Sequence, residues 1–229
     1  KTLLKRYSQT EDSVTANDTI VPIKAVEKKR SASLPIVKLS DLELNKIGIV
    51  VLEKAQDLFG GAIAEIGLTD GRGNVVIKDP TNDDLVLIVE LLASTKQIIG
   101  HDVKEIFHVL DRAGVDVTSL LFVPKFDTLV ASYLLAVGSR DFAYSDVVRV
   151  YLGVSIPSEA ILIDKIGSLL PLATTLSRKL GEEEMLDLAN NIEMPLIGVL
   201  FTMEKTGFAV DKARLDRLSK LFDERLQVL

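Results

Sequence analysis

Carboxylates and two histidines are the side chains with which this 229-residue sequence could carry out acid–base or metal chemistry, because it contains no cysteine. Asp41 and Glu43 form an Asp-x-Glu pattern, the first acidic signature of metal-dependent nucleases. Ser40 and Glu43 also have the spacing of a capping box at the start of a helix. We therefore expect these acids to open a short helix rather than to bind a metal ion.

The two histidines lack the clustered partners of a zinc or catalytic site. His101 falls at a predicted strand-to-helix turn, where we expect a capping or surface residue. His108 is expected beside Asp111 on the exposed face of a helix. The sequence has no Gly-x-Ser-x-Gly nucleophile motif, and its glycine pairs lack the strand–turn–helix context of a phosphate-binding loop.

Hydrophobic patterns predict an α/β fold. The continuous apolar run 47–52 predicts a central strand that is buried on both faces. The predicted strands are 34–39, 46–53, 62–69, 75–77, 97–100 and 120–123. The predicted helices are 82–93, 103–113, 126–137, 144–152 and 158–180, the last of them interrupted near Pro171. Three adjacent strands followed by alternating helices and strands indicate a mixed sheet flanked by helices.

Two segments flank this α/β region. Residues 1–33 are polar and lack an apolar period, which predicts a helix tail and a flexible linker. In the C-terminal segment, an apolar stripe that ends at Gly207 predicts a junction helix, which Pro195 should kink. Asp211 is predicted to cap a final amphipathic helix. The expected domains are 1–33, 34–180 and 181–229.

Two sets of residues at a characteristic spacing carry a family resemblance. They are Ile-Glu-Met-Pro-Leu (192–196), Val-Leu (199–200), Met-Glu-Lys-Thr-Gly (203–207) and Val-Asp (210–211), and Phe-Asp-Thr (126–128) with Tyr-Leu-Leu (133–135). Over 34–229 the sequence resembles the 3′–5′ exonuclease-like domain and its junction to the polymerase domain in bacterial family A DNA polymerases. The resemblance implies an RNase H-like exonuclease fold followed by junction helices. It also makes Asp127 the acid that begins a helix rather than a metal ligand.

Active members of this family hold two metal ions ~3.5–4 Å apart with four carboxylates. In the alignment, the first two carboxylates correspond to Leu52 and Lys54, and the third corresponds to Ile106. Glu53 lies between the first two positions, but neighbouring strand residues point to opposite faces. Glu105 precedes the third position, which displaces it by about 100° around a helix.

The fourth carboxylate of the family belongs to a Tyr-x-x-x-Asp or His-x-x-x-Asp, where the aligned region 162–168 offers apolar residues and serine. The resemblance therefore implies a degenerate site with no catalytic residue and no bound metal, as in Bacillus-type enzymes. The alternative is an active metal-dependent proofreading exonuclease that uses the displaced acids Glu53, Glu105 and Asp164.

Composition limits the classes of function that remain possible. The content of 47% hydrophobic and 26% charged residues is typical of a globular protein, without the ~20-residue apolar run of a membrane span. A net charge of −6 disfavours a nucleic-acid-binding module, a third possibility, because such binding depends on Lys and Arg. We expect a monomeric, cytoplasmic structural module of a DNA-directed DNA polymerase of replication or repair. Its expected partner is the polymerase domain of the same chain; DNA and Mg²⁺ would be bound by the parent enzyme, and no cofactor by this region.

Overall fold

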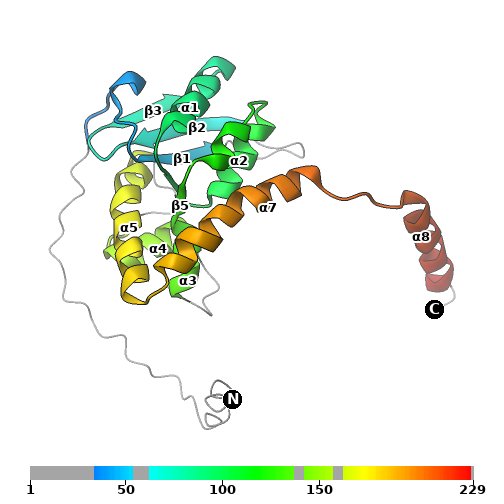
Figure 1. Ribbon diagram of the computed structural model, residues 1–229. Helices are drawn as coiled ribbons and strands as arrows, with labels where there is room; N and C mark the ends of the chain where they lie inside the picture. Colours follow the sequence, from blue (N-terminus) through cyan, green and yellow to red (C-terminus); the bar gives the residue numbers. More distant parts are fainter. Residues whose placement is uncertain (1–33, 54–61, 137–141, 157–161, 228–229) are drawn as a thin grey trace, which may run out of the picture. The chain divides into compact units, whose positions relative to one another are not determined.

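The computed structural model describes residues 34–53, 62–136, 142–156 and 162–227. The predicted linker 1–33 and the aligned position Lys54 lie outside these residues. The fold is built on a five-stranded sheet of order β3-β2-β1-β4-β5 (Figure 1). Its strands are β1 (Ile47–Glu53), β2 (Ile63–Thr69), β3 (Asn74–Lys78), β4 (Ile98–Gly100) and β5 (Lys125–Asp127).

The sheet is mixed, which confirms the predicted α/β class. β1 pairs antiparallel with β2, and β2 with β3, whereas β1, β4 and β5 run parallel to one another. The central position of β1 explains its unbroken apolar run, because Ile47 and Ile49 are completely buried. Parallel neighbours require crossover connections, which the helices between them supply.

Helices flank the sheet and continue beyond it. They are α1 (Asn82–Ser94), α2 (Val103–Arg112), α3 (Thr128–Leu135), α4 (Tyr144–Leu152), α5 (Leu162–Glu182), α6 (Leu186–Leu188), α7 (Met194–Thr206) and α8 (Lys212–Leu226). Shorter turns are the 3₁₀ helices η1 (Leu39–Asp41) and η2 (Thr118–Phe122) and the π-helical turn η3 (Ala189–Glu193). Within the described ranges, no helix has the length and apolarity that crossing a membrane requires.

Two glycines let α5 approach the sheet closely. A Cβ on Gly67 of β2 would lie 1.8 Å from Cδ1 of Ile166, and one on Gly48 of β1 would lie 3.1 Å from Cδ2 of Leu169. A side chain at either strand position would push the helix away. This close packing holds α5 against β1 and β2.

The predicted fifth strand at 120–123 is wrong. These residues belong to η2, in which Leu120 donates its N–H to the carbonyl of Val117 at 2.9 Å and is fully buried. The strand begins at Lys125, where Ile98 of β4 faces it. A short apolar run indicates burial without distinguishing a strand from a helical turn, and the error comes from that ambiguity.

The N-terminal edge also differs from its prediction. Instead of a strand over 34–39, only Ile36 forms a bridge, to Asn74. The predicted capping box of Ser40 and Glu43 is wrong, because the turn begins earlier, at Leu39. Glu43 instead pairs with Arg72 and donates its N–H to Asp70 Oδ2 at 3.0 Å.

Pro171 acts differently from its prediction, whereas the kink predicted at Pro195 stays a prediction. Pro171 does not interrupt α5, which continues to Glu182. Pro195 stands in the first turn of α7, directly after the π-helical turn η3. Because proline lacks an N–H and crowds the carbonyl four residues earlier, a widened turn accommodates it. Gly207 ends α7 as predicted, but its φ of 64° and ψ of −163° differ from the left-handed helical cap that was expected. Asp211 caps α8 as predicted, by accepting the N–H of Arg214 at 3.0 Å.

The hydrophobic core extends past the expected boundary at 180. Ala189, Met194, Ile197 and Phe201 belong to the same cluster of buried residues as the sheet. None of the residues of α8 is buried. The assignment of 34–180 and 181–229 to separate domains stays a prediction.

Candidate functional site

A small cavity of about 150 Å³ lies where β1, α2 and α5 meet, at the position of the aligned metal site. It is lined by Ile49, Val50, Val51, Leu52, His101, Ile106, Tyr144 and Lys165. The structure thus brings together Leu52 and Ile106, which lie far apart in the sequence and which the resemblance aligns with two of the family's carboxylates. None of the described residues that line this cavity is a carboxylate.

The residues that are present do not fit a pair of metal ions. Two-metal sites bind hard cations through carboxylate oxygens, which aliphatic side chains at Leu52 and Ile106 cannot replace. Lys165 adds a cationic side chain to the lining instead. Among the described residues, no group of three or more His, Cys, Asp or Glu side chains could hold a metal ion.

The displaced acids Glu53 and Glu105 do come together, but on an arginine. Nη2 of Arg112 in α2 donates to Oε1 of Glu53 at 3.2 Å and to Oε1 of Glu105 at 2.8 Å. Hydrogen bonds to Glu105 and Glu53 raise the pKa of the Arg112 guanidinium. The ladder between β1 and β2 changes register between Leu52 and Glu53, which adds a local irregularity at the end of β1.

The third displaced acid, Asp164, does not join this group. It is exposed in the first turn of α5 and does not line the cavity. A carboxylate in the first turn interacts favourably with the helix dipole, which explains the residue without a metal ligand role. The three acids named by the active alternative therefore do not form one site in the structure.

His101 is a structural residue of the cavity wall, not the capping or surface residue that was predicted. Its Nε2 lies 2.9 Å from the carbonyl oxygen of Phe142, and its Nδ1 lies 3.0 Å from Oγ1 of Thr128. Because a carbonyl can only accept, Nε2 carries the proton. The Thr128 hydroxyl that faces Nδ1 donates to the carbonyl oxygen of Gly100, which lies 3.1 Å from Oγ1. Burial lowers the pKa of His101 to about 4.

Tyr144 completes this wall. Its ring meets that of His101 edge-on with centroids 5.1 Å apart, and its hydroxyl lies 2.7 Å from the carbonyl of Lys165 and 2.8 Å from Oγ of Ser168. Burial raises the pKa of Tyr144 well above its usual value. The polar groups of both rings are thus occupied by protein partners, which leaves them in structural roles.

Acidification should lower the free energy of unfolding, because protonation of His101 is disfavoured in the fold. The imidazole titrates near 6.5 in an unfolded chain and near 4 in the fold, so the unfolded state binds the extra proton between these values. We expect the free energy of unfolding to fall by up to about 3 kcal/mol from this group as pH drops from 6.5 to 4. Urea unfolding of wild type and His101→Gln across pH 4–7 measures it. Parallel pH profiles for the two proteins would contradict the assignment, because the glutamine variant lacks the titrating ring.

Asp127 begins a helix, as predicted, but its role is larger. It is 1% exposed, and its carboxylate accepts the N–H groups of Leu129 at 2.8 Å and Val130 at 3.4 Å in α3. It also accepts the N–H groups of Asp102 at 3.0 Å and Val103 at 2.6 Å at the start of α2. Burial raises the pKa of Asp127 to about 6 even though these donors oppose the shift. This carboxylate joins two helix N-termini and is not free to bind a metal.

His108 also has a partner that differs from the prediction. Its Nε2 lies 2.8 Å from Oε2 of Glu204 in α7, and Asp111 is not that partner. Lys104 donates to Oε1 of Glu204 at 2.6 Å, and Lys205 of α7 donates to Oδ1 of Asp111 at 2.6 Å. The hydrogen bonds from Lys104 and His108 lower the pKa of Glu204. These contacts fasten α7 to α2.

The charged side chains of α2 therefore serve two purposes. Lys104, His108 and Asp111 hold α7, whereas Arg112 neutralises the acids near the end of β1. The sequence alone does not predict these two sets of ion pairs and hydrogen bonds. Apart from Glu105, the residues that pair with α2 lie far from it along the chain.

Comparisons with known proteins agree with the fold. No family model matches the chain. It is 33% identical over 167 residues to DNA polymerase I of Caldicellulosiruptor bescii, a match that covers 69% of this chain and 18% of the relative. It is 26% identical over 205 residues to DNA polymerase I of Geobacillus stearothermophilus, covering 81% of this chain and 23% of the relative. The chain belongs with the exonuclease-like region of bacterial family A DNA polymerases.

This family A region has the expected fold. The POL domain of Pol1 from M. smegmatis, solved in complex with a DNA primer-template and dNTP, superposes with a TM-score of 0.64 at 24% identity. That match covers 79% of this chain and 32% of the solved one. Brucella melitensis NrnC, solved with bound pGG, superposes with a TM-score of 0.56 at 18% identity over 78% of this chain and 94% of NrnC. These likenesses confirm the RNase H-like exonuclease fold. The chain spans only about a fifth of the length of the curated polymerase relatives named above.

Proposed function

We propose that this chain is a catalytically inactive 3′–5′ exonuclease-like domain that serves as a structural module of a family A DNA polymerase. The observation that carries the proposal is the cavity at the aligned metal site. Leu52 and Ile106 line it, and the nearest displaced acids are bound by Arg112. A two-metal exonuclease needs carboxylates to bind the ions that activate water and stabilise the leaving oxygen.

The proposed setting is that of the relatives. The module would sit in a cytoplasmic, monomeric DNA-directed DNA polymerase of replication or repair, beside the polymerase domain of the same chain. DNA and Mg²⁺ would be bound by that polymerase domain. The net charge of −6 supports this division, because a region that itself bound DNA tightly would need an excess of Lys and Arg.

A nuclease assay tests the proposal against the active alternative. The chain is incubated with a 3′-labelled single strand and Mg²⁺ or Mn²⁺, beside the double variant Glu53→Gln/Glu105→Gln. We expect no shortening above the buffer control for either protein. Metal-dependent, stepwise shortening that the double variant loses would show that the displaced acids form a working site. Equal traces of shortening in both proteins would identify a contaminating nuclease and would leave the wild type without activity of its own.

The same double variant is predicted to have a small effect on stability. Arg112 and Glu105 are each more than two-fifths exposed, and such pairs contribute little in water. We therefore expect Glu53→Gln/Glu105→Gln to change the free energy of unfolding by less than about 1 kcal/mol. Circular dichroism during urea unfolding measures this change and shows that the assay compares folded proteins.

A further inference from the structure

The helix α7 is apolar on two sides, and only one side is covered. Met194, Ile197 and Phe201 face the core and are at most 4% exposed. Val199 and Met203 lie on the other side and are 53% and 62% exposed. A helix that is apolar around most of its circumference is stable in water only when both sides are buried. The second side of α7 therefore requires a partner.

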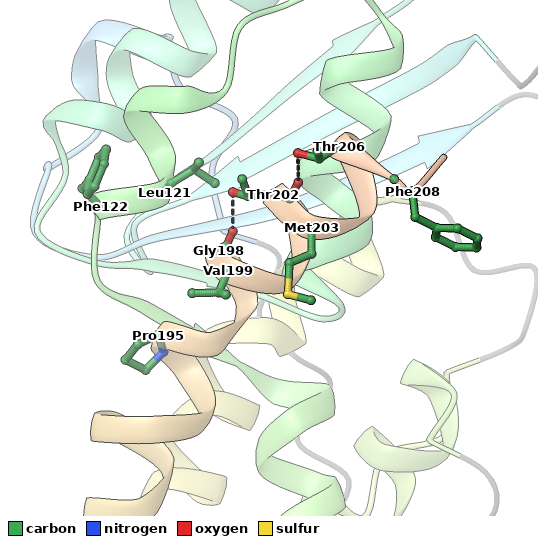
Figure 2. A pocket seen from close by; sticks show the side chains of 10 residues that line it. Leu121, Phe122, Pro195, Gly198, Val199, Thr202, Met203, Thr206 and Phe208 are labelled. Carbon is green, nitrogen blue, oxygen red and sulfur yellow. Dashed lines mark hydrogen bonds between the residues drawn. The ribbon is translucent and has the colours of Figure 1, made fainter. Parts of the chain in front are cut away.

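A groove runs along this second side. Its volume is about 650 Å³, and it lies between η2 and α7, along which its lining runs from Pro195 to Thr206. Phe122 and Phe208 bound it (Figure 2). Phe122 is 85% exposed and Phe208 is 90% exposed. Large aromatic side chains left this open in a globular domain mark an interaction surface rather than ordinary surface variation.

The uncharged lining of the groove favours a protein partner over a nucleic acid. The hydroxyl of Thr202 donates to the carbonyl of Gly198, and that of Thr206 donates to the carbonyl of Thr202, each at 2.8 Å (Figure 2). These hydroxyls are therefore satisfied within the helix. None of the described residues that line the groove carries a charge. Nucleic acid would need basic groups to neutralise its phosphates, so an apolar protein surface fits and a nucleic acid does not.

The uncovered surface continues along the chain toward its C-terminus. Val210, in the connection after α7, is 53% exposed. The apolar stripe of α8 follows, with Leu215, Leu218, Leu221, Phe222 and Leu226 all exposed. The uncovered side of α7 is thus followed along the chain by a second uncovered apolar stripe, on α8. In the polymerase relatives, about four-fifths of the chain lies outside the matched region.

We propose that the groove between η2 and α7 seats the polymerase domain of the same chain, with Phe122, Val199, Met203 and Phe208 as its main contacts. This inference rests on the proposed function, because it takes its occupant from the polymerase relatives. Covalent connection through α8 gives the two parts a high effective concentration, so a groove of modest area can remain occupied. The other occupants that the test distinguishes are α8 itself and a second copy of the chain.

Oxidation of the methionines tests the occupant directly. Met203 is 62% exposed and Met194 is 2% exposed, so the first reports on the groove and the second on the core. Limited peroxide treatment followed by mass spectrometry compares the 229-residue chain with the natural polymerase chain that carries it. We expect Met203 to oxidise readily in the first and at least about tenfold more slowly in the second, with Met194 protected in both. Equal oxidation of Met203 in both proteins would overturn the proposal.

A charged substitution in the groove distinguishes the polymerase domain from the two other possible occupants, α8 and a second copy of the chain. Val199→Asp should leave the unfolding and the monomeric state of the 229-residue chain unchanged, and should restore the oxidation of Met203 in the longer chain. The control is Val150→Asp, since Val150 is 58% exposed on α4, away from the groove lining. A loss of stability in the 229-residue chain would assign the groove to α8, and dissociation of a dimer would assign it to a second copy. Either result overturns the proposal, whereas metal-dependent nuclease activity would overturn only the proposed inactivity.

Discussion

Replacing Asp127 with alanine is expected to lower the free energy of unfolding by roughly 3 kcal/mol or more. The substitution leaves four backbone N–H groups at the starts of α2 and α3 without their acceptor, in a place that is 1% exposed. A buried donor without a partner costs about 1–3 kcal/mol, and the four costs are not fully additive. Ile106 of α2 lines the cavity, and Thr128 at the start of α3 contacts His101 of the cavity wall, so the site depends on this side chain.

Two matched variants make this prediction specific. Asp116→Ala removes an exposed carboxylate that accepts the N–H of Thr118 at 2.9 Å, and should cost no more than about 1 kcal/mol. Asp127→Asn keeps one acceptor oxygen without the charge that burial disfavours, so its loss should be intermediate. Urea unfolding followed by circular dichroism measures all three. A loss at Asp127→Ala no larger than that at Asp116→Ala would contradict the role of this carboxylate.

Replacing Phe201 with alanine is expected to cost about 3–5 kcal/mol, which is typical of a buried aromatic residue truncated in a core. Phe201 is 2% exposed, and its ring centroid lies 6.0 Å from that of Phe107 and 4.7 Å from that of His108. These ring contacts join α7 to α2. The substitution should loosen α7 as a whole.

Met203→Ala on the same helix is the matched control. Because Met203 is 62% exposed, its truncation in the 229-residue chain should change the free energy of unfolding by less than about 0.5 kcal/mol. Thermal and urea unfolding of both variants give the comparison. Similar losses for the two residues would mean that the sides of α7 have been assigned wrongly, and would remove the basis for an uncovered groove.

The regular elements could be predicted from the sequence because their signals are local. The apolar run of β1 is longer than the run at 120–123 and rich in β-branched residues, which favours a strand. The spacing of Leu85, Ile88, Val89 and Leu92 favours the helix α1. The run at 120–123 misled the prediction because its length suits either a strand or a helical turn. Pro171 misled it too, since a long, well-packed helix can accommodate one proline.

The candidate site was only partly predictable for a physical reason. The resemblance assigns Leu52 and Ile106 to the candidate site, and the structure brings both of them to one cavity. The sequence does not predict the role of Arg112, because Glu53 lies 59 residues away along the chain and the two side chains meet only when α2 packs beside β1. The contact of His108 with Glu204 spans 96 residues. Side-chain pairs of this kind depend on tertiary packing, which periodicity does not encode.

Calorimetric titration of the folded chain with Mn²⁺ tests the central claim most directly, because it measures the site without requiring DNA or turnover. A cavity lined by Leu52 and Ile106, with Glu53 and Glu105 held by Arg112, predicts no saturable binding of a metal pair. Saturable binding of two Mn²⁺ ions per chain, abolished by Glu53→Gln/Glu105→Gln, would contradict the account and would show that the exonuclease site survives in a displaced form.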